Sequence, residues 1–229
     1  MKNILLIGGS HGTGLALARL LHENHNVYIA SRTWEVTDLP NIKHIPFDAL
    51  TDALDTSTLP EQLNGLVYCP GSINLKPFKM LSVDTFKEDM QLNFFSLVNV
   101  VKDVLPKLAD GSSIVFFSTV AVQTGMPFHT SVAAAKGAIE GFTKSLAAEY
   151  APRIRVNAIA PSLVDTPLAA RLLNNDKKKE MMAQRHPLKR VGEATDMAKI
   201  AQFLLSPDSS WITGQIIGVD GGLSTLNVN

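Results

Sequence analysis

Gly8-Gly9-Ser10-His11-Gly12-Thr13-Gly14 follows the apolar run Ile4-Leu5-Leu6-Ile7 and leads into Leu15-Ala16-Leu17-Ala18. The apolar run is typical of a buried strand, and the residues after the glycines are typical of a helix. Glycines at 8, 12 and 14 permit a tight turn and let backbone N–H groups approach a pyrophosphate at a helix N-terminus. A glycine-rich connection without a ligand has the same composition, so the flanking strand and helix carry the prediction of a nucleotide-binding turn.

Short β-rich runs alternate with amphipathic segments along the whole chain. The strands we expect are Ile4–Ile7, Val27–Ala30, Leu66–Tyr68, Ile114–Ser118, Arg155–Ile159 and Ile216–Val219. The helices we expect include Gly14–Glu23, Val83–Leu108, Ser131–Tyr150 and Thr195–Leu205. This alternation predicts an α/β fold in which helices cover both faces of a parallel sheet. Since no linker or repeat interrupts the pattern, we expect one domain spanning residues 1–229.

Composition and charge narrow the class of protein. The chain has 21 basic and 21 acidic residues and no basic stripe with interleaved aromatics, which argues against nucleic acid as a partner. Cys69 is the only cysteine, which excludes an intrachain disulfide and suits a reducing compartment. The apolar run at the N-terminus is too short for a signal peptide, and no stretch is long enough to span a bilayer. We therefore expect a soluble cytoplasmic protein.

The end of the second predicted strand indicates which cofactor the turn prefers. The strand ends Tyr28-Ile29-Ala30-Ser31-Arg32, whereas a turn that binds NAD(H) places an acid here for the ribose 2′-hydroxyl. A guanidinium pairs with a phosphate, and a carboxylate at this place would repel one. With His11 as a second donor, Arg32 predicts NADP(H) in preference to NAD(H). The alternative is that Arg32 is an ordinary exposed arginine.

Later segments resemble one family of enzymes. Asn157-Ala158-Ile159-Ala160-Pro161-Ser162-Leu163-Val164-Asp165-Thr166 resembles the N-x-x-x-P-G-x-[VI]-x-T stretch of the short-chain dehydrogenase/reductase family, with Ser162 in place of glycine. Pro187–Gly192, Trp211–Gln215 and Val219–Gly222 resemble its P-L-x-R-x-G, I-T-G-Q and V-D-G-G motifs. The resemblance covers the whole chain in order. It implies a doubly wound Rossmann fold with a seven-stranded parallel sheet and a nicotinamide-dependent oxidoreductase.

The resemblance also implies roles for single residues. Asn93 matches an asparagine that anchors a water relay, Thr119 a serine that hydrogen-bonds the substrate carbonyl, and Lys136 a lysine that holds the nicotinamide ribose. Asp48 matches the acid beside the adenine. The cofactor-binding residues that we expect are Gly8, Ser10, His11, Gly12, Thr13, Gly14, Ser31, Arg32, Asp48, Ala49, Cys69, Gly71, Lys136, Pro161, Val164 and Thr166.

The family's tyrosine is missing. Val132-Ala133-Ala134-Ala135-Lys136 stands where the family has Tyr-x-x-x-Lys, and that tyrosine is its proton donor. Hydride transfer to a carbonyl leaves an alkoxide that needs a proton, and a positioned acid contributes roughly 10²–10⁴-fold to the rate. Two smaller departures are Ile7 and Tyr68-Cys69-Pro70-Gly71, which replace polar segments that contact each other in the family and predict a repacked core beside the turn.

Two side chains near position 132 could donate a proton in place of the missing tyrosine. Ser131 is one helical step, about 100°, from the face shared by Val132 and Lys136. His129 is seven residues before Lys136, the offset at which divergent enoyl-thioester reductases of this superfamily carry their tyrosine, and histidine titrates near neutrality. We therefore consider His129 as a substitute donor and as a loop residue without a chemical role.

Substrate and assembly follow less directly from the residues. We expect a mostly apolar pocket, and thus an apolar or acyl-like substrate, lined by Gln123, Met126, Phe128, Leu168, Leu172 and Met181. Lys177-Lys178-Lys179 predicts a solvated helix face in a segment placed to form a lid. Small residues along Ser131–Tyr150 match a helix that the family uses to form dimers and tetramers, so we expect a homo-oligomer. Three functions stay open: a carbonyl reductase with an altered proton donor, an enoyl-type reductase that uses His129, and a catalytically silent NADP(H)-binding protein.

Overall fold

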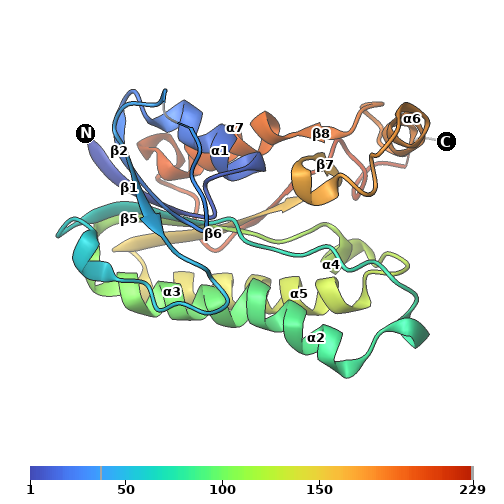
Figure 1. The fold of residues 1–229 in the computed structure, drawn as a ribbon, viewed down its shortest axis with the longest axis horizontal. Coiled ribbons are helices and arrows are strands. Elements are labelled where there is room, and N and C mark those ends of the chain that lie inside the picture. Colours follow the sequence, from blue (N-terminus) through green and yellow to red (C-terminus); the bar gives the residue numbers. More distant parts are fainter. Residues whose placement is uncertain (37, 228–229) are drawn as a thin grey trace.

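One parallel sheet organises the molecule in the computed structural model, which describes residues 1–36 and 38–227 (Figure 1). Its strands are β1 (Lys2–Ile7), β2 (His25–Ser31), β3 (Ile42–Pro46), β4 (Leu63–Tyr68), β5 (Leu108–Phe117), β6 (Ile154–Pro161) and β9 (Ile216–Val219). They form a seven-stranded sheet in the order β3-β2-β1-β4-β5-β6-β9, in which every neighbouring pair is parallel. This confirms the doubly wound α/β fold that the sequence predicts.

Helices cover both faces of the sheet (Figure 1). On one side lie α1 (Gly12–Leu21) and α7 (Ala194–Leu205), and on the other α2 (Val83–Met90), α3 (Ser96–Val104) and α5 (Thr130–Tyr150). Shorter elements at one end are α4 (Ala121–Thr124), α6 (Asp176–Gln184), β7 (Val164–Asp165) and β8 (Gly192–Glu193). In the part of the chain that the structure describes, no helix is long and apolar enough to cross a membrane.

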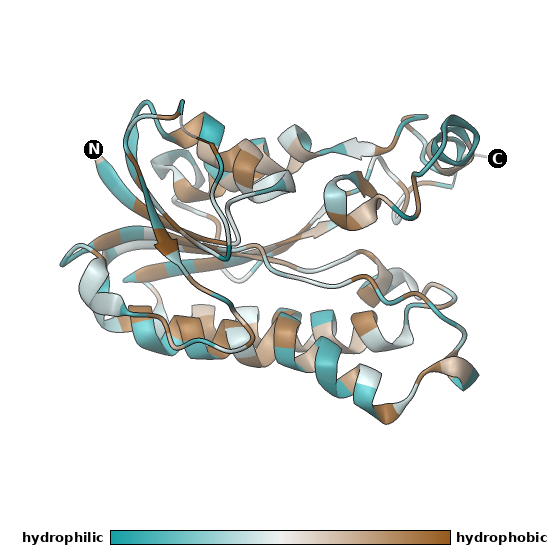
Figure 2. Ribbon diagram, in the orientation of Figure 1, coloured by the Kyte–Doolittle hydropathy of each residue, from teal (hydrophilic) through white to brown (hydrophobic). Residues whose placement is uncertain are grey.

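Two apolar clusters hold these layers together. Because successive side chains of a strand point to opposite faces, Leu5 and Ile7 of β1 pack in the cluster under α3 and α5, while Ile4 and Leu6 pack in the cluster under α1 and α7. All four are at most 1% exposed. Burial of each side chain stabilises the fold by roughly 1.5–3 kcal/mol. Figure 2 shows apolar residues concentrated in the strands and interspersed with polar residues along the helices.

For the strands of the seven-stranded sheet and the long helices, the predicted elements agree with the structure except in two places. The strand Ile42–Pro46 was missed, because its alternation is short and ends in proline. The helix predicted over Val83–Leu108 is wrong as one piece: α2 ends at Met90, Gln91–Phe95 forms a π-helical turn, and α3 ends at Val104 before Leu108 begins β5. A π-turn inserts an extra residue into the helix and leaves side chains free to bond its carbonyls.

The strand order creates a crevice at one edge of the sheet. Strands β2 and β3 lie on one side of β1, whereas β4 lies on its other side. The chain therefore reverses its winding direction between β1 and β4. In open α/β sheets, ligands bind outside the carboxyl ends of the strands at such a switch point. Here the ends are Ile7–Gly8 and Tyr68–Cys69, which are joined by a hydrogen bond of 3.0 Å from the Cys69 amide to the Ile7 carbonyl.

Candidate active site

The glycine turn after β1 is shaped for close approach to a ligand. Gly8 has φ of +76°, and its amide donates to the Ala30 carbonyl at 2.8 Å, which holds the turn on β2. A Cβ at Gly14 would lie 2.5 Å from the Gly8 carbonyl oxygen, so no larger residue fits where α1 passes the turn. His11 caps α1 without a side-chain bond, which leaves the first amides of the helix directed at the crevice.

A cavity of about 260 Å³ lies beside this turn, and we call it the glycine-turn cavity. It is lined by Ile7, Gly8, Ser10, His11, Ala30, Ser31, Arg32, Phe47, Asp48, Ala49, Leu50, Cys69, Pro70, Gly71, Leu92 and Leu168. Arg32 is exposed at its edge, and the Ser31 hydroxyl donates to the Thr33 carbonyl at 2.9 Å. Asp48 is the one acid in this lining, and its carboxylate accepts from the Leu50 amide at 2.9 Å.

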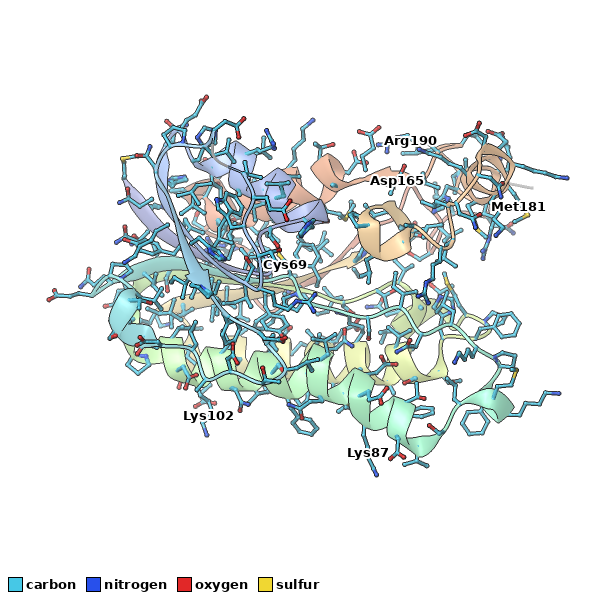
Figure 3. The ribbon with its side chains drawn as sticks, in the orientation of Figure 1. Cys69, Lys87, Lys102, Asp165, Met181 and Arg190 are labelled. Carbon is cyan, nitrogen blue, oxygen red and sulfur yellow. The ribbon has the colours of Figure 1, made fainter. Side chains whose placement is uncertain are left out.

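A second cavity, of about 270 Å³, lies at the ends of β4, β5 and β6, and we call it the lysine cavity. Among the residues that line it are Thr13, Cys69, Gly71, Thr119, Met126, His129, Val132, Lys136, Pro161, Ser162, Val164, Thr166, Leu168, Leu172, Arg185 and His186. Cys69, Gly71 and Leu168 border both cavities. The two cavities therefore adjoin, and together they form a cleft with the glycine turn at one end and Lys136 at the other. Figure 3 shows Cys69 near the middle of the molecule, at the strand ends.

Lys136 of α5 is the only lysine in the lining of the lysine cavity. It is 7% exposed, and its ammonium donates to the Phe117 carbonyl at 2.9 Å. Burial lowers the pKa of Lys136 to about 8, against the opposing attraction of Cys69 and Asp89. A Cβ on Gly71 would lie 3.3 Å from the Lys136 Nζ and 3.2 Å from the Asn93 Oδ1, so both polar atoms face the same point.

Asn93 lies in the π-turn and is fully buried behind Gly71. Its Nδ2 donates to the Asp89 carbonyl and to the Ser72 hydroxyl, both at 2.8 Å, but its Oδ1 bonds to none of the described residues. Tyr68 anchors the turn, because its hydroxyl donates to the Leu92 carbonyl at 2.8 Å. The unpartnered Oδ1 and the glycine cradle fit a bound dinucleotide with associated water, as the resemblance implies.

A buried carboxylate supports the same region. Asp89 is 1% exposed and accepts hydrogen bonds from Ser72, from Asn74 at 2.7 Å and from Ser131 at 2.5 Å. Ser131 therefore points away from the cavity toward α2, as its position one step round the helix predicts. Sequence analysis missed Asp89, because a single acid in an amphipathic helix is indistinguishable from a solvated one.

The proton-donor slot faces the lysine cavity. Val132 is 5% exposed, and it lines the cavity together with Thr119 and His129. The Thr119 hydroxyl accepts from the Ala121 amide at 3.3 Å, which leaves its proton free. His129 is the residue before α5, and its Nδ1 lies 2.7 Å from the Pro127 carbonyl. Because a carbonyl only accepts, Nδ1 carries the proton and Nε2 is open.

The structure places most of the predicted site residues along the cleft. Three of the predicted residues line neither cavity but lie directly behind the residues that do: Gly12, Gly14 and Asn93. A Cβ at Gly12, for example, would lie 3.3 Å from Thr166, which lines the lysine cavity. Three of the predicted lining residues are wrong: Gln123 donates to Glu140, Phe128 is 55% exposed, and Met181 is 55% exposed. Met181 points outward from α6 (Figure 3), and the next residue, Met182, lines the cavity instead.

The lysine run lies on the exposed surface of α6, as predicted. Lys179 pairs with Asp165 at 2.5 Å, and this hydrogen bond raises the pKa of Lys179. Both side chains are about half exposed, so the pair adds little stability. Helix α6 covers the outer side of the lysine cavity together with a short 3-10 helix, Pro167–Ala169.

Comparisons with known proteins agree with this geometry. A family model described as "Enoyl-(Acyl carrier protein) reductase" matches residues 36–224. A tropinone reductase homolog from Datura stramonium is 32% identical over 95% of this chain and 90% of its own length. A 3-oxoacyl-[acyl-carrier-protein] reductase from Chlamydia muridarum is 31% identical over 97% of both chains.

Solved structures are similar over the whole length. A short chain dehydrogenase family protein from Francisella tularensis superposes with a TM-score of 0.90 at 29% identity, covering 99% of this chain and all of the other. ElxO with NADP bound superposes with a TM-score of 0.85 at 25% identity, covering 97% and 98%. Matching motifs, sheet order and cleft all point the same way: the chain belongs to the short-chain dehydrogenase/reductase family of oxidoreductases.

Proposed function

We propose that this protein is an NADP(H)-dependent reductase of a small apolar carbonyl compound whose proton donor differs from the family's tyrosine. The observation that carries the proposal is the continuous cleft, in which the glycine turn and Lys136 border cavities that meet at Cys69 and Gly71. The relatives named as 3-oxoacyl and tropinone reductases support a carbonyl substrate, and the apolar lining supports an acyl-like one.

The preference for NADP(H) is supported by the charges near the end of β2. Arg32 borders the glycine-turn cavity, while Ser31 stands where an NAD(H)-binding turn has its acid. The only acid in that lining, Asp48, is engaged with the Leu50 amide. His11, whose Nδ1 lies 2.9 Å from the Ser10 hydroxyl, adds a second donor for a phosphate. The related structure ElxO has NADP bound, which supports this proposal.

The residues of the lysine cavity have separate roles in the proposed reduction. Bound NADPH supplies the hydride. Thr119 would donate a hydrogen bond to the substrate oxygen, and Lys136 would hold the ribose hydroxyls and place a positive charge beside the developing alkoxide. Val132 contributes shape but no proton.

His129 is the proposed proton source. It borders the same cavity as Val132 and Lys136, and its Nδ1–H is held by the Pro127 carbonyl. The proton would therefore leave from Nε2 of the protonated ring, which becomes neutral with its remaining proton on Nδ1. For a conjugated enoyl substrate the demand on this acid is smaller, because the enolate formed is less basic than an alkoxide. Enoyl reduction through His129 is therefore the second candidate, and the description of the matching family model favours it.

Assembly is proposed from exposed surface on α5. Ala134 and Gly141 are exposed small residues on this helix, and Trp211 is 99% exposed in the C-terminal segment. Such surface suits close packing of a second copy of a protein that we take to be one domain over residues 1–229. A monomeric mass by light scattering at micromolar concentration would contradict a homo-oligomer.

Titration with NADPH and NADH, followed by nicotinamide fluorescence, tests the cofactor assignment. We expect tighter binding of NADPH in the wild-type protein and loss of the preference in Arg32→Ala. Turnover is then measured with 4-nitrobenzaldehyde, which has only a carbonyl, and with trans-cinnamaldehyde, which also offers a conjugated double bond. His129→Ala should lower whichever rate is found.

Binding of NADPH without turnover of either compound would favour a catalytically silent NADP(H)-binding protein. This outcome is expected if no other group supplies the proton that the buried Val132 lacks. Absence of binding by both nucleotides would refute the proposed function altogether.

A further inference from the structure

Ser162 and His186 form a hydrogen-bonded pair on the wall of the lysine cavity. The Ser162 hydroxyl lies 2.9 Å from the Nε2 of His186, and both residues line the cavity. His186 is 4% exposed. Ser162 stands where the family motif has glycine, so this chain carries a hydroxyl at a place where the motif has no side chain.

The position of Ser162 puts it beside the reacting end of the cleft. It directly follows β6, and the carbonyl of Pro161 accepts from the Val120 amide at 3.1 Å. Val120 is next to Thr119, the proposed partner of the substrate oxygen. Ser162 and Thr119 therefore follow the paired strands β6 and β5 at the same edge of the sheet, whereas His129 lies at the start of α5.

The ring of His186 is oriented by a second bond. Its Nδ1 lies 2.9 Å from the Met182 carbonyl, so Nδ1 carries a proton in every charge state. When the imidazole is neutral, Nε2 accepts the Ser162 proton and the serine offers only lone pairs. When the imidazole is protonated, Nε2–H donates to Ser162, and the serine proton is free to bond a ligand oxygen.

The charges around the pair are arranged for an anion. None of the described residues that line the lysine cavity is acidic, while Arg185 and Lys136 both border it. Behind His186 lie Arg190, Asp196, Lys199 and Asp220.

Both acids behind the ring have hydrogen-bond partners of their own, and Asp220 also interacts electrostatically with His186. Asp196 is paired with Arg190 at 2.6 Å. Asp220 accepts from the Gly222 amide and from Ser224; burial would raise the pKa of Asp220, but these bonds outweigh it and lower the pKa. An anion in the cavity would therefore meet the Ser162–His186 pair and Arg185 without facing a carboxylate.

We propose that Ser162 and His186 recognise an anionic oxygen of the substrate, and that the substrate is an apolar acid with the carboxylate at this end. The inference rests on the proposed reductase function, since it names the substrate class of that cavity. The apolar wall, which includes Ile73, Leu75, Leu163, Leu172 and Met182, accommodates the hydrocarbon part. Binding takes up a proton, because the anion favours the imidazolium form. Affinity for the anion is highest while the ring is protonated and falls when the ring loses its proton.

Calorimetric titration with hexanoate and with hexanamide tests the proposal without turnover. The two probes have the same chain and nearly the same shape, but only hexanoate is charged. Measurements are made with and without saturating NADP⁺, at about pH 6 and about pH 8, on either side of the ordinary titration of histidine. Two buffers of different ionisation enthalpy report proton uptake. The variants are Ser162→Gly, which restores the family residue, and His186→Gln, with His22→Gln, a histidine outside both cavities, as the control.

We expect hexanoate to bind about tenfold more tightly than hexanamide at the lower pH, as one charge-assisted hydrogen bond provides. The preference should shrink at the higher pH, coincide with proton uptake, and disappear in Ser162→Gly and His186→Gln but not in His22→Gln. Equal or absent binding of the two probes, or a preference that survives both variants, overturns the proposal. Failure of the reductase function is seen separately as absent NADPH binding, which leaves the hexanoate comparison readable on the protein alone.

Discussion

Replacing Val132 by tyrosine should convert the lysine cavity into the family's ordinary proton-donating site. Val132 borders a cavity of about 270 Å³, so the larger ring has space in the cleft and does not need to enter the core. A positioned acid contributes about 10²–10⁴-fold, or about 2.7–5.5 kcal/mol of transition-state stabilisation. We expect the rate of 4-nitrobenzaldehyde reduction to rise within that range.

The magnitude depends on the charge of Lys136. Residues four apart on a helix have Cβ atoms about 5–6 Å apart. At about 6 Å and an effective dielectric constant of about 20, a unit charge contributes about 3 kcal/mol, which would lower the pKa of the new phenol by about 2 units. The pKa of Lys136 is about 8, because burial disfavours the ammonium. The benefit is therefore present below pH 8 and is lost as Lys136 deprotonates above it.

The assay is single-turnover oxidation of NADPH across this pH range, with Val132→Phe as the matched control. Phenylalanine has nearly the same bulk but no hydroxyl, so it reports any effect of filling the cavity. The reasoning fails if the tyrosine and phenylalanine variants reduce the aldehyde at the same rate while both bind NADPH. It also fails if the gain of the tyrosine variant is unchanged above pH 8.

Three further outcomes test separate parts of the structure. Arg32→Glu should weaken NADPH binding by at least about tenfold and leave NADH nearly unaffected, measured by fluorescence titration, because a carboxylate repels the 2′-phosphate. Gly14→Ala should lower the free energy of unfolding by about 1–3 kcal/mol in urea titrations, since its Cβ would meet the Gly8 carbonyl. Asp89→Leu should cost about 2–4 kcal/mol in the same experiment, because three buried or half-buried donors lose their acceptor, and an unchanged midpoint would show that they find other partners.

The local pattern of the chain predicted six of the seven strands of the sheet, and it predicted which end of the sheet carries the site. Strand and helix periodicity depends on neighbouring residues within one element. The turn that needs Gly8 and Gly14 is likewise formed by residues close together in the sequence. Arg32 and Lys136 were found for the same reason, because each follows a recognisable strand or motif. The place of Val132 beside Lys136 follows from a spacing of four on one helix.

What the local pattern did not predict depends on residues that meet only after folding. The π-turn that buries Asn93 is held by a hydrogen bond from Tyr68, which lies at the end of β4. Strand β3 is stabilised by pairing with β2, although its own alternation of apolar and polar residues is weak. Met182 rather than Met181 faces the cavity because packing sets the rotation of α6. Ser162 and His186 are 24 residues apart and are brought together by the fold of the segment between β6 and α7. Periodicity carries no information about such contacts, since their geometry is fixed by strand order and by the packing of layers on the sheet.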